Sequence, residues 1–160
     1  MYNVAILEPE RGKIATLLQN RLAERGGPSV TLIRGGHLHA FSGAYDLFVA
    51  ASPTEEGGAA SPALSCRALL TCAETPIIPS QWVVDYGLSV RDSLTVSSLE
   101  PNHAVLALQR ELVTLDGTVI EQQELPLPIP SGTSVQGVMA LYGSLLILGV
   151  PPEELTGGTH

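Results

Sequence analysis

The N-terminal part of the chain sets a helical pattern between two short apolar runs, and this arrangement constrains the fold most. Residues 3–7 form an apolar run closed by Glu8-Pro9, and residues 29–33 form a second. Between them lies an amphipathic helix pattern that stops at Gly26-Gly27, with apolar positions at Ile14, Leu17, Leu18 and Leu22. Two strands joined by one helix pair in parallel through a right-handed crossover. We expect Pro9 in the first helical turn.

Further short elements extend this unit into a sheet. Residues 45–51 predict a third strand buried on both faces, and Ser61-Pro62 predicts the start of a helix that runs to Cys72. Residues 77–78 and 82–86 then predict more strand. The predicted helix carries both cysteines, Cys66 and Cys72, on largely different faces, so we interpret them as buried, inert thiols that are not disulfide-bonded to each other.

The pattern changes after Gly87, where short strands follow one another without helices. They are expected at 93–97, 105–108, 111–115 and 118–122. Asp116-Gly117 between the last two predicts a two-residue type I′ hairpin turn. Residues 134–148 then predict one very apolar helix, capped by Ser134 and stopped by Gly149.

Together these elements predict an α/β fold with a three-layer open mixed sheet, helices on both faces of its parallel part. A parallel βαβ N-terminal half is followed by an antiparallel β meander and a C-terminal apolar helix. We expect a single domain over 1–155, with the parallel part at about 1–87, the meander and helix at about 88–155, and a frayed tail at 156–160. The meander either joins the same sheet or forms a second small one.

Composition narrows the function. The chain has 160 residues, 44% hydrophobic content and a net charge of -8, which suits one buried core and disfavours nucleic acid and membrane surfaces as partners. No apolar run approaches the roughly 18 residues of a membrane span, and the N-terminal sequence lacks a basic leader. We therefore expect a cytoplasmic protein.

The C-terminal half resembles a known family. Residues 82–155 contain Val83-Val84-Asp85-Tyr86-Gly87-Leu88-Ser89, a meander, Leu125-Pro126-Leu127-Pro128, a helix and Leu148-Gly149-Val150-Pro151. This order resembles the last part of the ATP-binding central domain of Mur ligases. The family carries glycine, a His-Asn pair and a further asparagine before and within the helix, whereas this chain has Ser131, Thr133, Ser134 and Gly137 there.

The nucleotide-binding motif implied by that resemblance is missing. Mur ligases need a glycine-rich loop with a Lys-Thr or Lys-Ser pair, and the only lysine here, Lys13, is followed by Ile14. Residues 4–51 show a second resemblance, to the opening of response-regulator receivers, with Glu8 and Glu10 in place of the acidic pair. The phosphate-accepting aspartate of that family would fall near Ala51. We interpret this resemblance as shared α/β geometry.

Other chemical groupings are incomplete. His37 and His39 alternate as a metal pair would, but no cysteine or carboxylate set completes a site, so solvated loop histidines are favoured. The candidate nucleophiles are Cys66, Cys72, Ser97 and Ser98, the two serines with His103 as their partner. The Gly-x-Ser-x-Gly motif that typically presents a nucleophilic serine is not present. Glu8 and Glu10 are expected to stabilise the positive end of the first helix. Trp82 is interpreted as core, with a partner-binding patch as the alternative.

Two hypotheses about function follow. The first is a non-catalytic Mur-ligase-like domain without cofactor or metal, which binds a protein partner or itself; its apolar helix, including Leu146, suggests a homodimer surface unless it is wholly internal. The second is a small-molecule (anion or nucleotide) binding protein or enzyme with its site at the carboxyl ends of the parallel strands. The residues predicted for this site are Glu8, Glu10, Arg34, Gly35, Gly36, His37 and Ser52.

Overall fold

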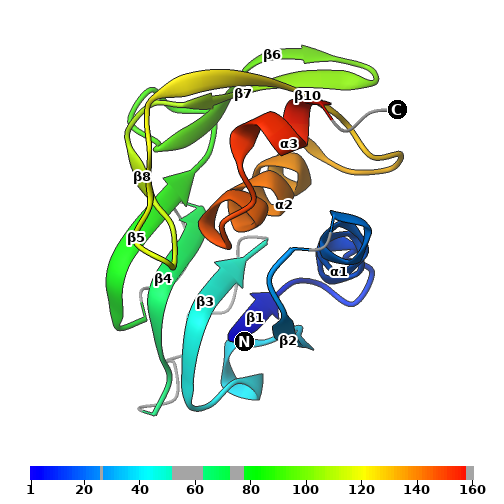
Figure 1. Ribbon diagram of the computed structural model, residues 1–160. Helices are drawn as coiled ribbons and strands as arrows, with labels where there is room; N and C mark the ends of the chain where they lie inside the picture. The colour runs from blue at the N-terminus through cyan, green and yellow to red at the C-terminus, as the bar shows by residue number, and fades with distance from the viewer. Residues whose placement is uncertain (26, 52–62, 73–77, 158–160) are drawn as a thin grey trace.

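The computed structural model describes residues 1–160 except 26, 52–62, 73–77 and 158–160 (Figure 1). Its helical elements are α1 (Ile14–Arg25), the 3₁₀ turn η1 (Leu38–Ala40), α2 (Val135–Ile147) and α3 (Pro152–Gly157). Its strands are β1 (Tyr2–Leu7), β2 (Val30–Gly35), β3 (Ala44–Ala50), β4 (Ser65–Cys72), β5 (Ser80–Tyr86), β6 (Leu94–Glu100), β7 (His103–Leu108), β8 (Leu112–Val113), β9 (Val119–Ile120) and β10 (Gln123–Pro128). None of the helices in these ranges has the length and apolarity to cross a membrane.

One mixed sheet of eight strands organises the fold. Its order is β10-β7-β6-β5-β4-β3-β1-β2, and β8 and β9 form a separate two-stranded sheet. The strands from β2 to β6 pair in parallel, whereas β6, β7 and β10 pair antiparallel. The expected α/β fold with a mixed sheet is thus confirmed. The first two strands of the expected meander, β6 and β7, join the main sheet, whereas the last two, β8 and β9, form the small separate one.

The N-terminal unit forms as expected, since β1 and β2 pair in parallel on either side of α1 in the chain. Helix α1 begins at Ile14, so the expectation for Pro9 is wrong. Pro9 instead starts a tight turn in which the Gly12 amide donates to the Pro9 carbonyl at 2.8 Å. The helix ends at Arg25, and the Gly27 amide donates back to the Leu22 carbonyl at 3.1 Å. The predicted glycine stop is confirmed at Gly27; Gly26 lies outside the described residues.

The helix expected from Ser61-Pro62 to Cys72 is wrong. Residues 65–72 form β4, which lies between β3 and β5, and 61–62 lie outside the described residues. Most of β4 is buried, and a buried strand shows a continuous apolar run that a short helix can share. Both cysteines are buried and free, as expected, although a strand carries them.

The C-terminal half also contains an unpredicted strand, β10, which ends in Leu125-Pro126-Leu127-Pro128. It pairs only with β7 and forms one edge of the sheet. Proline lacks an amide hydrogen, so it is tolerated at an edge, where one side of the strand has no partner. The two prolines argue against a strand in the sequence pattern, which is why β10 was not predicted.

The predicted Asp116-Gly117 turn is longer than two residues. Val113 pairs with Val119, and the Gly117 amide donates to the Thr114 carbonyl at 3.0 Å. Gly117 has a φ of 88°, whereas no described non-glycine residue has a positive φ. A type I′ turn needs positive φ at both central positions, so this hairpin has a wider loop instead.

Helix α2 is internal. It lies in the concave side of the sheet, with β6, β7 and β10 curled over it and α1 at its side (Figure 1). Every residue from Gly137 to Ile147, including Leu146, is buried within one copy of the chain. Of the two alternatives for this helix, the internal one is therefore confirmed, because the sheet and α1 already cover its apolar side chains. Both predicted ends are confirmed: Ser134 caps the helix, and Gly149 follows it with a φ of 102°.

The core has two parts, one on each face of the sheet. The larger part holds the buried side chains of α1 and α2 with those of the facing strands. The smaller part, on the opposite face, gathers Phe41, Tyr45, Phe48 and Leu64 beside η1. The three layers are thus two α-helices, the sheet, and a layer of which the described part carries a 3₁₀ turn instead of an α-helix. Helix α3 extends into the segment expected to be a frayed tail.

Trp82 belongs to the larger core. Its half-buried ring packs against that cluster, and the Arg67 guanidinium lies 5.9 Å from the ring centroid. Arg67 also donates to the Leu115 carbonyl at 2.8 Å and to the Asp46 carboxylate at 3.3 Å. This arginine ties the β8–β9 hairpin to β3 and β5, which supports the core interpretation of Trp82.

Candidate functional site

The candidate site lies where β1 and β3 end side by side. The order β2-β1-β3-β4-β5 is a doubly wound order. The direction in which successive strands are added to the sheet reverses between β1 and β3, although the two strands are parallel, and open α/β sheets place ligands at such a point. The Ala51 amide donates to the Leu7 carbonyl at 2.8 Å, which holds the two strand ends together. A pocket of about 290 Å³ opens there, and the first residues of both α1 and α2 line it.

Glu8 fills the N-terminus of α1. Its side chain, only 1% exposed, turns back along the chain, and its two carboxylate oxygens accept from the Ile14 amide at 3.0 Å and the Ala15 amide at 2.9 Å. Amides in the first turn of a helix lack partners within the helix, and they carry the positive end of its dipole. The same two features make helix N-termini bind phosphate. Glu8 therefore supplies from within the chain the anion that such a site would take from a ligand.

Two residues keep this carboxylate in place. A Cβ on Gly12 would lie 2.1 Å from Glu8 Oε1, so only glycine leaves room for the turned-back side chain. Arg34, at the end of β2, places its Nε 3.4 Å from Glu8 Oε2 and donates through Nη2 to the Pro9 carbonyl. The charge of Arg34 is thus directed at Glu8 and the turn that follows it.

The N-terminus of α2 faces the same pocket with a weaker cap. The Ser134 hydroxyl accepts from the Gly137 amide at 3.0 Å. Thr133 also lines the pocket, and its Oγ1 is buried without a hydrogen-bond partner. Lys13, the residue just before α1, approaches this end of the pocket, since a Cβ on Gly132 would lie 3.3 Å from its Nζ. This end of the pocket therefore combines a lysine ammonium, an unsatisfied hydroxyl and a neutral cap.

The structure brings together only part of the predicted site. Glu8 and Arg34 form an ion pair, and the Glu8 amide donates to the Gly35 carbonyl at 3.0 Å. A Cβ on Gly36 would lie 3.7 Å from the Glu8 carbonyl oxygen, so Gly36 is next to the pair. The expectation that Glu8 stabilises the first helix is confirmed.

The other predicted residues lie away from this pair. Glu10 is exposed in the turn before α1. The His37 ring stacks on His39 with centroids 5.3 Å apart, at the start of η1. Ser52 lies outside the described residues. The sequence predicts that Arg34 and the glycine amides hold an anion from a ligand, whereas in the structure Arg34 is paired with the carboxylate of Glu8.

Sequence reasoning missed Gly12 and the α2 side of the pocket. Gly12 follows Pro9 by three residues, a spacing typical of a tight turn, and this was the only signal for it. Thr133, Ser134 and Gly137, which line the pocket, were noted only as positions where Mur-ligase residues are absent. Lys13, noted only because Ile14 follows it in place of a serine or threonine, lies just before α1 and lines the pocket.

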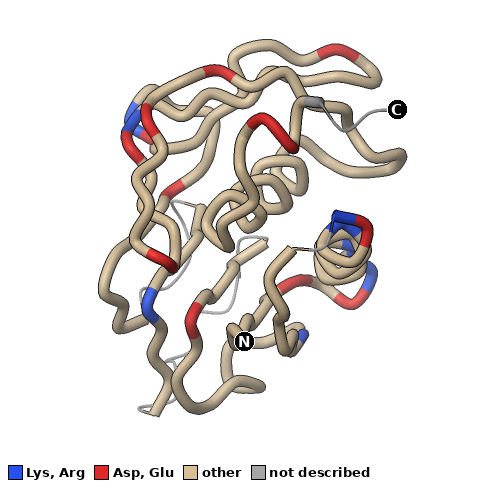
Figure 2. The backbone as a smooth tube through the Cα atoms, in the orientation of Figure 1, with Lys and Arg blue, Asp and Glu red and all other residues tan. Residues whose placement is uncertain are grey.

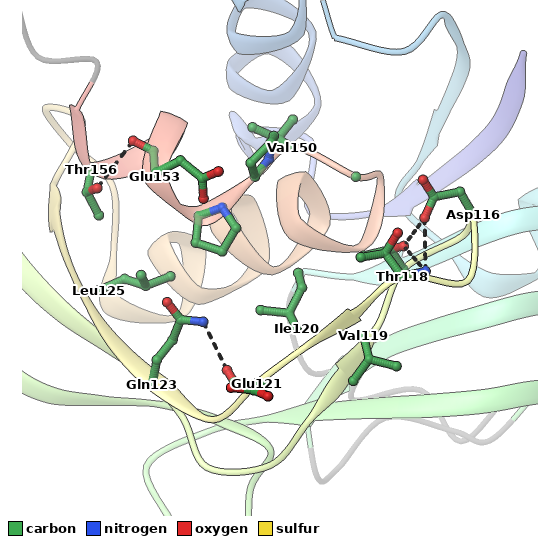
Figure 3. A pocket seen from close by; sticks show the side chains of 14 residues that line it. Asp116, Thr118, Val119, Ile120, Glu121, Gln123, Leu125, Val150, Glu153 and Thr156 are labelled. Carbon is green, nitrogen blue, oxygen red and sulfur yellow. Dashed lines mark hydrogen bonds between the residues drawn. The ribbon is translucent and has the colours of Figure 1, made fainter.

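A second hollow, of about 640 Å³, lies between the β8–β9 hairpin and α3 (Figure 3). We call it the hairpin groove. Apolar side chains of Val119, Ile120, Leu125 and Val150 line it, and the charged residues in the described part of its lining are acidic: Asp116, Glu121 and Glu153. Hydrogen bonds from the Thr114 hydroxyl and from Thr118 lower the pKa of the Asp116 carboxyl. No sequence signal pointed to this groove, because its residues come from two segments about thirty positions apart in the chain.

The candidate nucleophiles do not form a reactive grouping. Burial raises the pKa of the Cys66 thiol to about 12, which disfavours the reactive thiolate. His103 is paired with Glu100 across the β6–β7 hairpin, while Ser98 lies opposite Val105. Among the described residues, no group of three or more His, Cys, Asp or Glu side chains is placed to hold a metal ion.

Comparisons with known proteins add no family. No family model matches the chain, and no curated protein or solved structure is significantly similar to it. The fold and the site define an α/β domain of doubly wound strand order in which the N-terminus of the first helix is filled by its own glutamate.

Proposed function

We propose that this chain is a non-catalytic, Mur-ligase-like α/β domain that works by binding a protein partner or a second copy of itself. The observation that carries the proposal is the Glu8 carboxylate on the N-terminus of α1. A nucleotide phosphate at this helix end would have to displace a buried carboxylate held by two amides and Arg34. Like charges in one site repel strongly, so phosphate is disfavoured there.

The order of elements supports the Mur-ligase-like part of the proposal. Strand β5, the β6–β7 meander, β10 and α2 follow one another as the resemblance over 82–155 implies. Three of the positions that lack the family's polar residues, Thr133, Ser134 and Gly137, line the pocket beside Lys13. Loss of nucleotide-binding residues at this position fits a domain that has kept the fold and changed its task. A cytoplasmic location remains part of the proposal.

The proposal is tested by titrating the protein with ATP and Mg²⁺ in a calorimeter, together with a thermal-shift panel of nucleotides, UDP-sugars and acidic amino acids. We expect no binding heat, no rise in melting temperature and no ATP hydrolysis, because a ligand that binds only the folded state would raise the melting temperature. Binding of ATP that is lost in Lys13→Met, together with hydrolysis above that of buffer, would overturn the non-catalytic assignment.

A second candidate function is anion binding at the α2 side of the pocket. It is favoured by the buried Thr133 hydroxyl, which lacks a partner, and by the Lys13 ammonium beside Gly132. Buried polar groups without partners are uncommon, and an anion held by Lys13 would accept a hydrogen bond from this hydroxyl. The position is separate from the helix end that Glu8 fills.

Inorganic phosphate is the probe for this candidate. Titration followed by amide NMR should move the signals of residues 132–137, and Lys13→Met should abolish the change. Arg11→Gln is the matched control, since Arg11 also lines the pocket but belongs to the turn before α1. Shifts of equal size in wild type and Lys13→Met, or none in either, would remove the candidate.

A further inference from the structure

The turn after β5 presents apolar side chains to solvent on a rigid frame, and we call residues 88–91 the apolar tip. Leu88 is 71% exposed and Val90 is 88% exposed, and Arg91 next to them is exposed as well. Single exposed apolar residues are common on protein surfaces. Two large ones at the end of one turn, with a cation beside them, form a compact feature suited to contact with another molecule.

Side chains below the tip fix its backbone. The buried Asp92 carboxylate accepts from the Ser89 amide at 3.0 Å, and the Asp92 amide donates to the Ser89 carbonyl at 3.1 Å. Gln109, just after β7, donates from its side-chain amide to the carbonyls of Ser89, at 3.2 Å, and Asp92, at 2.7 Å. A Cβ on Gly87 would lie 2.5 Å from Asp92 Oδ2, so glycine is needed here too. A tip held in this way loses little conformational entropy on binding.

The hairpin groove has the complementary chemistry. Its apolar side chains come from β9, β10 and the segment before α3, and its charged residues, Asp116, Glu121 and Glu153, come from the hairpin loop, the segment after β9 and α3 (Figure 3). Among the residues that the structure describes, no lysine, arginine or histidine lines it. Its volume lies within the range of ligand pockets, with room for several side chains. Apolar side chains next to one cation match such a surface in both polarity and charge.

We propose that the apolar tip of one copy docks in the hairpin groove of a second copy. Leu88 and Val90 would cover the apolar floor formed by Val119, Ile120 and Val150, and Arg91 would approach Glu121 and Glu153. Tip and groove are different surfaces, so the contact is head-to-tail and forms a ring or an open chain. This inference rests on the proposed function, because it names the partner of a domain that acts by binding.

The charge distribution sets the conditions for this contact. Half of the eight basic residues belong to α1 and the turn before it, and Figure 2 shows the blue segments concentrated there, while acidic ones are spread over the chain. Two copies of net charge -8 repel at long range, but this repulsion is screened beyond about 8 Å at physiological ionic strength. We therefore expect the contact to form at physiological salt and to weaken in dilute buffer.

Sedimentation velocity over a concentration series up to millimolar protein tests the proposal with two variants. Val90→Asp damages the tip, and Glu121→Lys/Glu153→Lys reverses the charge of the groove. Each variant alone should stay monomeric where wild type associates, with affinity reduced about tenfold or more by the lost apolar contact or the reversed charge pairs. Leu99→Asp and Glu100→Lys are matched controls, since both change exposed residues on β6, outside tip and groove.

Mixing the two variants gives the decisive result. The tip variant keeps an intact groove and the groove variant keeps an intact tip, so an equimolar mixture should form a one-to-one heterodimer and nothing larger. Melting curves of each variant verify that the change has not unfolded the chain. A monomeric wild type, variants that associate like wild type, or a monomeric mixture would each overturn the proposal.

The proposed function is tested separately by the ATP titration. If the wild type is monomeric and does not bind ATP, the proposed head-to-tail contact is refuted, and the domain would bind a different protein as its partner. Wild type that binds and hydrolyses ATP would end the non-catalytic assignment, whatever its oligomeric state.

Discussion

The two helix N-termini that meet at the ends of β1 and β3 are satisfied in different ways. Helix α1 begins under a buried carboxylate that accepts from two of its amides, and Arg34 lies beside that carboxylate. Helix α2 begins under a serine hydroxyl that accepts from one amide, with a lysine ammonium and an unsatisfied threonine hydroxyl nearby.

At this edge of the sheet, the N-terminus of α1 contributes to stability, whereas the N-terminus of α2 remains able to bind a ligand. A helix end filled by the chain itself contributes to folding and has no need of a ligand, whereas a weakly capped end keeps its positive field available. Substitutions at the α1 end should therefore change mainly stability, and substitutions at the α2 end should change stability less.

The largest effect is expected from Glu8→Ala. It leaves the Ile14 and Ala15 amides without their acceptor and Arg34 without its ion-pair partner, so we expect a loss of about 3 kcal/mol in the free energy of unfolding. Urea denaturation measures the change. Glu10→Ala is the control, expected within about 0.5 kcal/mol of wild type because Glu10 is exposed. Equal effects of the two substitutions would refute the contrast between the helix ends.

Gly12→Ala comes next and tests whether the glycine acts through Glu8. The added Cβ would collide with Glu8 Oε1, so we expect a loss of about 2 kcal/mol. In a Glu8→Ala background the contacts with Oε1 and the carboxyl carbon are absent and only a 3.0 Å contact with the Cβ of residue 8 remains, so the same substitution should cost less by about 1 kcal/mol or more. Urea denaturation of the four proteins in this cycle gives the coupling energy, and additive effects would show that Gly12 is needed for another reason.

The sequence predicts elements well where the pattern is local. Residues 3–33 specify strand, helix and strand through their spacing, and Ser134 and Gly149 mark the ends of α2, because caps act within a few residues. Prediction from the sequence fails at β4 and β10. The apolar run of β4 fits either a helix or a buried strand, and the prolines of β10 are acceptable only because this strand lies at the edge of the sheet.

The candidate site shows the same limit. The edge of the sheet and the pair Glu8 and Arg34 follow from the strand ends, so sequence reasoning placed them in one region. The direction of the Glu8 side chain does not follow, because it depends on how the Pro9–Gly12 turn presents the first amides of α1. A carboxylate that stabilises a helix and one that awaits a metal or proton have the same sequence signature.

Ser134→Ala is expected to cost less than either change at the α1 end. A lost hydroxyl cap reduces the free energy of unfolding by about 1 kcal/mol. The measurement is again urea denaturation, with Ser131→Ala as the control, because Ser131 is exposed in the preceding turn. A loss as large as that of Glu8→Ala would mean that both helix ends depend equally on their caps.

The smallest effect, and one of opposite sign, is expected from Thr133→Val. Thr133 Oγ1 is buried without a partner, and replacing an unsatisfied hydroxyl by a methyl group of the same shape removes its desolvation cost. We expect the free energy of unfolding to stay level or rise by up to about 1 kcal/mol. Thr95→Val is the contrasting control: it removes a half-buried hydroxyl on β6, away from the pocket, so it should change stability little. A clear loss at Thr133 would show that its hydroxyl has a partner in solution. Such a loss in phosphate buffer alone would identify that partner as an anion and join the α2 end to the second candidate function.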